Sequence, residues 1–215
     1  MNTGSHLGVK HPVATGDWDM PAPMQERSRK TAERFIQVAL QLLREKTYAE
    51  LSVAELAQKA GRSVGVFYQR FGSKDDFLHV LLSAYFRDSL GWREKITPDG
   101  SPAEIYADIL ARGYRGIVEN RNLWHAALER SAADPSFWAT YHSFRERVGA
   151  MTLNVVEAAA GRQFDAGERR QLAIAGQVFN SVINNQIING PGPLRLEDED
   201  FLPELTKIAL DLAPF

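Results

Sequence analysis

The chain has 215 residues, 44% of them hydrophobic and 24% charged, which are the proportions of a soluble globular protein of one or two domains. No apolar run approaches the roughly 20 residues that a membrane-spanning helix needs, and the first residues lack the apolar segment of a signal peptide. We therefore expect a cytoplasmic protein with no membrane partner. The absence of cysteine excludes disulfides, thiol catalysis and cysteine-ligated metal sites.

The charge is unevenly distributed along the chain. The net charge is −2, but residues 25–74 contain ten Lys/Arg and five Asp/Glu, whereas residues 75–215 contain fourteen and twenty. A basic segment joined to an acidic one suggests a polyanion-binding surface near the amino terminus. The excess is modest, so ordinary variation in composition remains an alternative.

The first predicted elements are an arm and an amphipathic helix. Residues 1–24 mix Gly, Pro, Thr, Asp and His without periodicity and are expected to form a flexible arm. From residue 25 to about residue 46, apolar side chains recur at helical spacing. These are Phe35, Val38, Ala39, Leu42 and Leu43.

Two short helices are predicted next. Ser52 precedes the first as an N-cap, and Glu55 three residues later completes the pattern of a capping box. Gly61 stands where a left-handed C-cap is needed. Ser63 then caps a helix that ends at Gly72, although its valines and aromatic residues are weak helix formers.

The remaining elements are also predicted to be helical. Ser73 is the N-cap of a fourth helix, with Asp75 and Asp76 in its first turn. The later helical segments lie between cap and breaker signals and span 101–120, 123–133, 135–161, 165–190 and 199–212. No segment shows the alternation of a strand, so the predicted class is all-α.

The two short helices, joined by a tight turn at Gly61, have the spacing of a helix-turn-helix. Phe67 and Phe71 lie four residues apart and are expected to anchor the second of them in the core. The residues then expected to face away from the core are Gly65, Val66 and Gln69. Successive caps and exposed small residues favour DNA binding over a simple three-helix core.

The segment LSVAELAQKAGRSVGVFYQRFGSKDDFLHVLL resembles the DNA-binding segment of TetR-family transcriptional regulators. The match includes the Ala-Gly turn and extends through the upstream helix RFIQVALQLLREK, over about residues 27–85. The matching residues are Ser63, Gly65, Tyr68, Phe71 and Lys74. The resemblance implies a nine- or ten-helix protein with a DNA-binding domain at 25–73 and an effector-binding and dimerisation bundle at 74–215.

Three positions depart from the family pattern. Thr47 stands where the family usually has Gly, so the end of the first helix must be capped in another way. Arg62 replaces a small apolar residue, and Arg70 stands where His is more common. Both arginines are expected to strengthen phosphate contacts.

The resemblance and the positions together imply roles in DNA binding. Phosphate contacts are expected from Ser52, Ser63, Tyr68, Ser73 and Lys74. Base edges are expected to meet Val64, Val66 and Gln69, because valines suit thymine methyls and glutamine can pair with adenine. Gly65 allows close approach of the backbone. A core aromatic at Tyr68 and a solvated charge at Lys74 remain alternatives.

The resemblance also implies a pocket for a small, largely apolar effector in the second domain. The candidate aromatic residues are Phe86, Tyr106, Tyr114, Trp124, Trp138 and Tyr141. The candidate polar residues, at helical spacing, are Gln177, Asn180 and Asn184. These amides could equally be exposed or lie at a dimer seam.

No cofactor, metal site or enzymatic activity is expected. His125 and His142 each precede a glutamate by four residues, a spacing more typical of an ion pair on one helix face than of a metal site. The chain has no H-E-x-x-H, P-loop, G-x-S-x-G or dinucleotide fingerprint.

We therefore predict a homodimeric repressor that a small effector releases from a palindromic double-stranded DNA operator. One alternative is an all-α carrier or enzyme with an incidental helix-turn-helix. Another keeps DNA binding but makes the protein an activator, or a regulator that responds to a protein partner, because the sign of regulation depends on where the operator lies.

Overall fold

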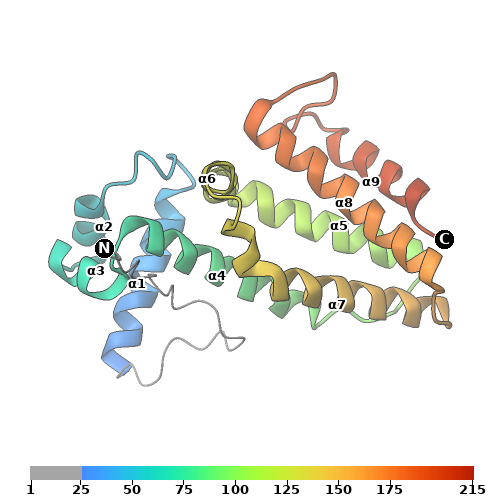
Figure 1. The fold of residues 1–215 in the computed structure, drawn as a ribbon, viewed down its shortest axis with the longest axis horizontal. Coiled ribbons are helices and arrows are strands. Elements are labelled where there is room, and N and C mark those ends of the chain that lie inside the picture. Colours follow the sequence, from blue (N-terminus) through green and yellow to red (C-terminus); the bar gives the residue numbers. More distant parts are fainter. Residues whose placement is uncertain (1–25) are drawn as a thin grey trace, which may run out of the picture.

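The computed structural model describes residues 26–215, which form nine α-helices and one 3₁₀-helix without a strand (Figure 1). The predicted all-α class is confirmed for these residues. The predicted arm at 1–24 lies outside the described residues. Between residues 26 and 215, no helix is both long and apolar enough to cross a membrane.

Four helices follow one another through the amino-terminal part of the chain (Figure 1). They are α1 (Glu26–Leu42), α2 (Val53–Ala60), α3 (Val64–Phe71) and α4 (Lys74–Arg93). Gly61 adopts the left-handed conformation predicted for it, with φ 66° and ψ 40°, which turns the chain between α2 and α3. Helices α2 and α3 therefore form the predicted helix-turn-helix.

The first helix ends at Leu42, about four residues before the predicted end, and turns follow. The missing glycine at Thr47 is replaced by a side-chain cap. The Thr47 amide and Oγ1 both donate hydrogen bonds to Glu50 Oε2, at 2.9 and 2.8 Å. These bonds lower the pKa of the exposed Glu50 carboxyl.

Only half of the predicted capping box at the start of α2 forms. The Ser52 hydroxyl accepts a hydrogen bond from the Glu55 amide at 3.1 Å, as expected. The Glu55 carboxylate does not reach back, because it accepts two hydrogen bonds from Lys46 Nζ at 2.8 and 2.9 Å. The prediction was wrong for Glu55, whose charge is used to hold α2 against the turn after α1.

The later helices are α5 (Pro102–Glu119), α6 (Arg121–Ala133), η1 (Phe137–Tyr141), α7 (His142–Ala160), α8 (Ala166–Asn189) and α9 (Phe201–Leu212). The single helix predicted over 135–161 is divided into two elements, the 3₁₀-helix η1 and the α-helix α7. Residues three apart eclipse one another in a 3₁₀ turn. Trp138, Tyr141 and Phe144 follow this spacing, and all three pack into one core.

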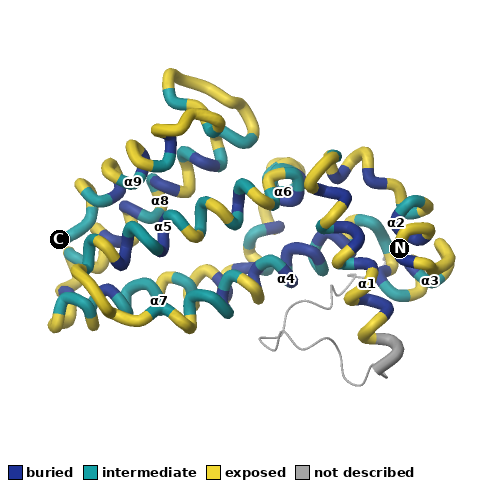
Figure 2. The backbone as a smooth tube through the Cα atoms, turned by 180° about the vertical axis from the view of Figure 1, so that it is seen from behind, coloured by how far each residue is buried: buried dark blue, intermediate teal, exposed yellow. Residues whose placement is uncertain are grey.

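Two hydrophobic cores hold these helices. The first joins α1–α4 to α6, η1 and the start of α7. The second joins α5, α8 and α9 to the later part of α7 (Figure 2). At the centre of the first, Phe35, Phe67, Phe71 and Phe77 pack with ring centroids 4.5–5.6 Å apart. Phe77 belongs to α4, so the first core continues across the expected boundary between residues 73 and 74.

Candidate nucleic-acid interface

Helix α3 has one buried and one exposed face. Phe67 is fully buried and Phe71 nearly so, which confirms them as the anchors predicted for this helix. On the other face, Val64 is 40% and Tyr68 49% exposed, and Gln69 is exposed beside them. Helix α3 lies at one end of the molecule (Figure 2).

Val66 differs from its expected orientation. It is half-buried and packs against the first core rather than facing away from it. An apolar side chain beside Phe67 gains more from burial than from exposure, and this preference decides its position. The exposed candidates for reading bases are therefore Val64 and Gln69.

Gly65 lies in the first turn of α3, and the fold itself does not require a glycine there. Its φ angle is not positive, and a Cβ built on it would meet only the Ser63 Oγ, at 3.8 Å. Glycine in a helix costs about 0.5–1 kcal/mol relative to alanine. Since no internal contact explains this cost, the absent side chain indicates close approach by another molecule.

The three capping serines are not equivalent. The Ser63 hydroxyl accepts from the Val66 amide at 3.3 Å, and Ser52 acts likewise on α2, so both hydroxyl hydrogens remain available to a phosphate. The Ser73 hydroxyl instead donates to Asp76 Oδ2 at 2.7 Å. This bond uses its hydrogen and places a negative charge beside it, which disfavours the phosphate contact predicted for Ser73.

Lys74 is held in place at the start of α4. Its Nζ donates to the Ala49 carbonyl at 3.2 Å and lies 5.0 Å from the centre of the Tyr48 ring. Burial lowers the pKa of Lys74, and Asp75 opposes that shift. An ammonium group has three donors, so two remain for a phosphate. The Tyr48 hydroxyl donates to the Lys74 carbonyl and completes this contact between the α1–α2 connection and α4.

The two additional arginines flank α3. Arg62 is exposed, and its Nη1 donates to the Gly61 carbonyl at 2.9 Å. Arg70 is half-buried, and burial lowers its pKa. The exposed Arg62 is thus the more accessible of the two.

Four of the residues predicted to bind an effector lie together in the first core. They are Phe86, Trp124, Trp138 and Tyr141, whose ring centroids are 4.9–6.1 Å apart. Tyr106 and Tyr114 lie elsewhere. The Tyr114 hydroxyl donates to the Leu196 carbonyl at 3.1 Å, and the buried Tyr106 hydroxyl points to the Leu172 carbonyl at 3.5 Å.

The three amides of α8 separate into two groups. Asn184 is half-buried, and its Oδ1 accepts a hydrogen bond from Trp124 Nε1 at 2.7 Å. Gln177 and Asn180 are exposed, and Asn180 Nδ2 donates to the Gly176 carbonyl within its own helix. Asn184 alone therefore faces the aromatic interior, while the other two lie on the outer face of α8.

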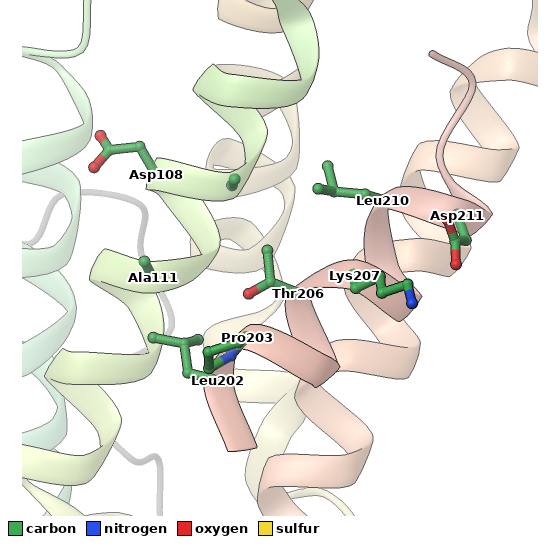
Figure 3. Close-up of a pocket in the computed structure, with 9 residues that line it drawn as sticks. Asp108, Ala111, Leu202, Pro203, Thr206, Lys207, Leu210 and Asp211 are labelled. Carbon is green, nitrogen blue, oxygen red and sulfur yellow. The ribbon is translucent and has the colours of Figure 1, made fainter. Parts of the chain in front are cut away.

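A groove of about 540 Å³ lies between α5 and α9 (Figure 3). Leu202, Thr206 and Leu210 line its α9 side, facing Ala111 of α5. A crevice of about 230 Å³ lies between α4 and α7, with Phe86 in its lining. Phe86 is the only predicted effector residue that lines either depression.

The two histidine–glutamate pairs are ordinary ion pairs on single helices. His125 Nδ1 lies 3.3 Å from Glu129, and His142 Nε2 lies 3.2 Å from Glu146. Within the part of the chain that the structure describes, no three His, Asp or Glu side chains are grouped as metal ligands.

Comparisons with known proteins agree with this geometry. Residues 35–81, which contain α2, α3 and parts of α1 and α4, match the family model described as "Bacterial regulatory proteins, tetR family". The chain is 43% identical over 58 residues to an uncharacterised HTH-type transcriptional regulator, YwcC, of Bacillus subtilis (strain 168). This match spans 27% of the chain and 26% of that protein.

Solved structures are similar over a longer part of the chain. A TetR transcription regulator from Haloarcula marismortui ATCC 43049 has a TM-score of 0.63 at 20% identity, over 86% of this chain and 97% of that one. For a TetR transcriptional regulator from Rhodococcus sp. RHA1, the TM-score is 0.56 at 23% identity, over 87% and 97%. At these identities the similarity establishes the fold alone. The helix-turn-helix segment therefore matches the DNA-binding part of TetR-family transcriptional regulators, and most of the chain shares the fold of TetR regulators.

Proposed function

We propose that the chain acts as a homodimeric repressor that binds a pseudo-palindromic operator and is released by a small-molecule effector. The observation that carries this proposal is the uncovered face of α3, where Gly65 has no internal contact that requires it. A helix whose exposed face carries small side chains can enter the major groove of duplex DNA. The basic balance of residues 25–74 supports a polyanionic partner.

In this proposal, phosphate contacts surround α3 and a few side chains read bases. Tyr68, Ser63, Ser52 and Lys74 contact the backbone, with Arg62 adding charge at the edge of the site. Gln69 reads an adenine edge, and Val64 contacts a thymine methyl. The contribution of phosphates to affinity makes binding strongly dependent on salt.

The dimer is proposed to form through the outer faces of α8 and α9. These helices pack against each other and carry exposed apolar side chains on the side away from the second core. They are Ile174 and Ile188 on α8, and Ile208 and Leu212 on α9, each 39–46% exposed. Exposed apolar side chains gathered on two adjacent helices are typical of a protein–protein interface. A two-fold dimer presents two copies of α3 to half-sites about one helical turn, or a multiple of it, apart.

The effector is proposed to bind among α4, α5, α6 and α8, where aromatic side chains meet a few polar groups. An effector shifts the distance between the two copies of α3 only if it binds the released arrangement more tightly than the DNA-bound one. We propose that DNA binding represses transcription and that effector binding relieves this repression.

Selection of bound sequences from random duplex DNA tests the proposed function. The expected result is a palindromic motif, enriched more strongly at low salt than at high salt. Gln69→Ala should enrich the same motif with relaxed preference at one base pair of each half-site. Gln58→Ala, an exposed glutamine of α2, is the matched control and should retain the full motif. Failure to enrich any sequence at low salt would contradict the proposal.

A further inference from the structure

One side chain of α4 carries a charge that no described residue neutralises. Arg93 is the last residue of α4. It lies four residues after Ser89 and eight after Tyr85, so the three side chains share one face of the helix. Its Nη1 donates to the Ser89 carbonyl at 3.0 Å and also to the Ser89 hydroxyl. These bonds fix the orientation of the guanidinium plane.

The opposite edge of the Arg93 guanidinium has no partner in the described chain. Its Nε is buried without a hydrogen bond, and Nη2 makes none either. Among residues 26–215, no carboxylate lies within 4.0 Å of this group. Even the adjacent Glu94 turns away and lies 3.7 Å from Arg147 of α7. Burial lowers the pKa of Arg93 to about 10, as expected for a buried cation without a counter-charge.

An aromatic ring and two glycines lie beside this edge. The Arg93 guanidinium lies 4.0 Å from the centre of the Trp92 ring. On the facing helix α5, Gly113 and Gly116 remove side chains where α4 comes near. A Cβ at Gly113 would lie 3.6 Å from Arg93 Nη2, and one at Gly116 would lie 3.5 Å from the Tyr85 hydroxyl.

The Tyr85 hydroxyl is a second polar group without a partner at this place. It makes no hydrogen bond to any described residue, and burial raises its pKa to about 12, with Arg93 opposing that shift. The phenol therefore remains protonated and can donate a hydrogen bond. The Trp124 ring centroid lies 5.6 Å from that of Tyr85, and both side chains pack against the second core.

We propose that the effector is a carboxylate on an apolar body, and that the Nε and Nη2 edge of Arg93 binds this carboxylate side-on. A guanidinium presents two parallel N–H donors along that edge, and their spacing matches the two oxygens of a planar carboxylate. Tyr85 supplies a further donor, and the aromatic side chains contact the apolar body. This inference rests on the effector-binding part of the proposed function, and it names the chemical class of the effector.

The test uses acetate, benzoate and decanoate, each beside its uncharged amide, with ionic strength matched by sodium chloride. The full-length protein is followed by thermal unfolding and by the NMR resonance of the Arg93 Nε–H, assigned by comparison with Arg93→Lys. The expected result is a saturable shift of this resonance and a higher unfolding temperature with at least one carboxylate, but with none of the amides.

Substitutions at Arg93 distinguish side-on binding of a carboxylate to the guanidinium from nonspecific attraction of anions to positive charge. Arg93→Met should abolish the increase in unfolding temperature. Arg93→Lys keeps the charge but loses the planar edge and should weaken binding at least about tenfold. Arg87→Met removes an exposed arginine of the same helix and should respond as the unsubstituted protein does. Binding that persists in Arg93→Met, or an unmoved Nε–H resonance with all three carboxylates, overturns the proposal.

The same reagents distinguish this inference from the proposed function. Selection of operator DNA contains no carboxylate, so it succeeds or fails independently of Arg93. Arg93→Met should no longer be released from the selected operator by the active carboxylate, whereas Arg87→Met should still be released. An operator that is found while carboxylates fail to bind refutes the inference alone. Carboxylate binding without any operator refutes the regulatory proposal alone.

Discussion

Asn122 Nδ2 donates a hydrogen bond to the carbonyl oxygen of Leu43, 2.8 Å away, and thereby joins α6 to the end of α1. Two residues further along α6, Trp124 donates to Asn184 of α8. Helix α6 is therefore fixed at one position to the segment containing the helix-turn-helix and at another to the proposed dimerisation helices. A shift of α6 relative to either partner must strain one of these bonds.

Asn122→Ala should lower the free energy of unfolding by about 1 kcal/mol, because the carbonyl of the buried Leu43 loses its donor. Amide hydrogen exchange near the end of α1 should increase at the same time. Asn154→Ala on α7 removes an exposed amide and serves as the control, with no change expected. Equal effects of the two substitutions would show that the bond to Leu43 contributes nothing measurable.

Gly65→Ala should raise the free energy of unfolding by about 0.5–1 kcal/mol, because alanine is the better helix former and meets no clash. The same methyl group should weaken operator binding by blocking close approach of α3. Gly149→Ala, at an exposed position of α7 with nothing within 4 Å, should stabilise the protein equally and leave operator binding unchanged. Undiminished operator affinity in Gly65→Ala would mean that DNA does not approach this position.

Lys74→Ala should weaken binding to all DNA sequences alike, because a phosphate contact carries no sequence information. The slope of log affinity against log salt should fall by about one unit. Filter binding or fluorescence anisotropy over a range of salt concentrations measures both quantities. Lys207→Ala removes an exposed charge from α9 and should leave the slope as it is.

Ile208→Glu should convert the proposed dimer into monomers, because it places a charge within the apolar outer face of α9. Sedimentation velocity measures the change in mass, and operator affinity should fall with it, since a monomer engages only one half-site. Ala150→Glu introduces the same charge on the exposed side of α7 and should leave the mass unchanged. A dimer that survives Ile208→Glu would exclude this face as its interface.

The capping box at the start of α8 predicts a dependence of stability on pH. Hydrogen bonds from Arg162 and from the Asp165 amide lower the pKa of Glu168 from 4.5 to about 2. Because the folded value is depressed, this stabilisation is present above the unfolded pKa and is lost as pH falls from about 4.5 toward 2. Urea unfolding should show a difference between the protein and Glu168→Gln at pH 7 that shrinks at pH 3. A constant difference would contradict this linkage.

The sequence was most informative where local interactions decide the structure. Ser52, Ser63 and Ser73 act as N-caps because each bond spans three residues, and Gly61 turns the chain for a local steric reason. The predicted order of helices was correct for similar reasons. Such features follow from spacing and residue type without knowledge of the rest of the fold.

Other features depend on contacts between distant segments. Glu55 pairs with Lys46, Val66 turns into the core, and the division before α7 follows the packing of aromatic residues. The sequence analysis also passed over Arg93. Its spacing from Ser89 and Tyr85 places it on one face of α4, but only the folded chain shows that no carboxylate of residues 26–215 neutralises it.

Phe77 completes the aromatic cluster of the first core although it belongs to α4. A fragment cut at residue 73 would therefore leave the rings of Phe67 and Phe71 open to water. Recombination that exchanges DNA-reading modules between regulators must carry the first turns of α4 with the module, through Leu81 and Leu82, which are fully buried. The natural unit of exchange is thus longer than the helix-turn-helix, and it ends inside a helix rather than in a loop.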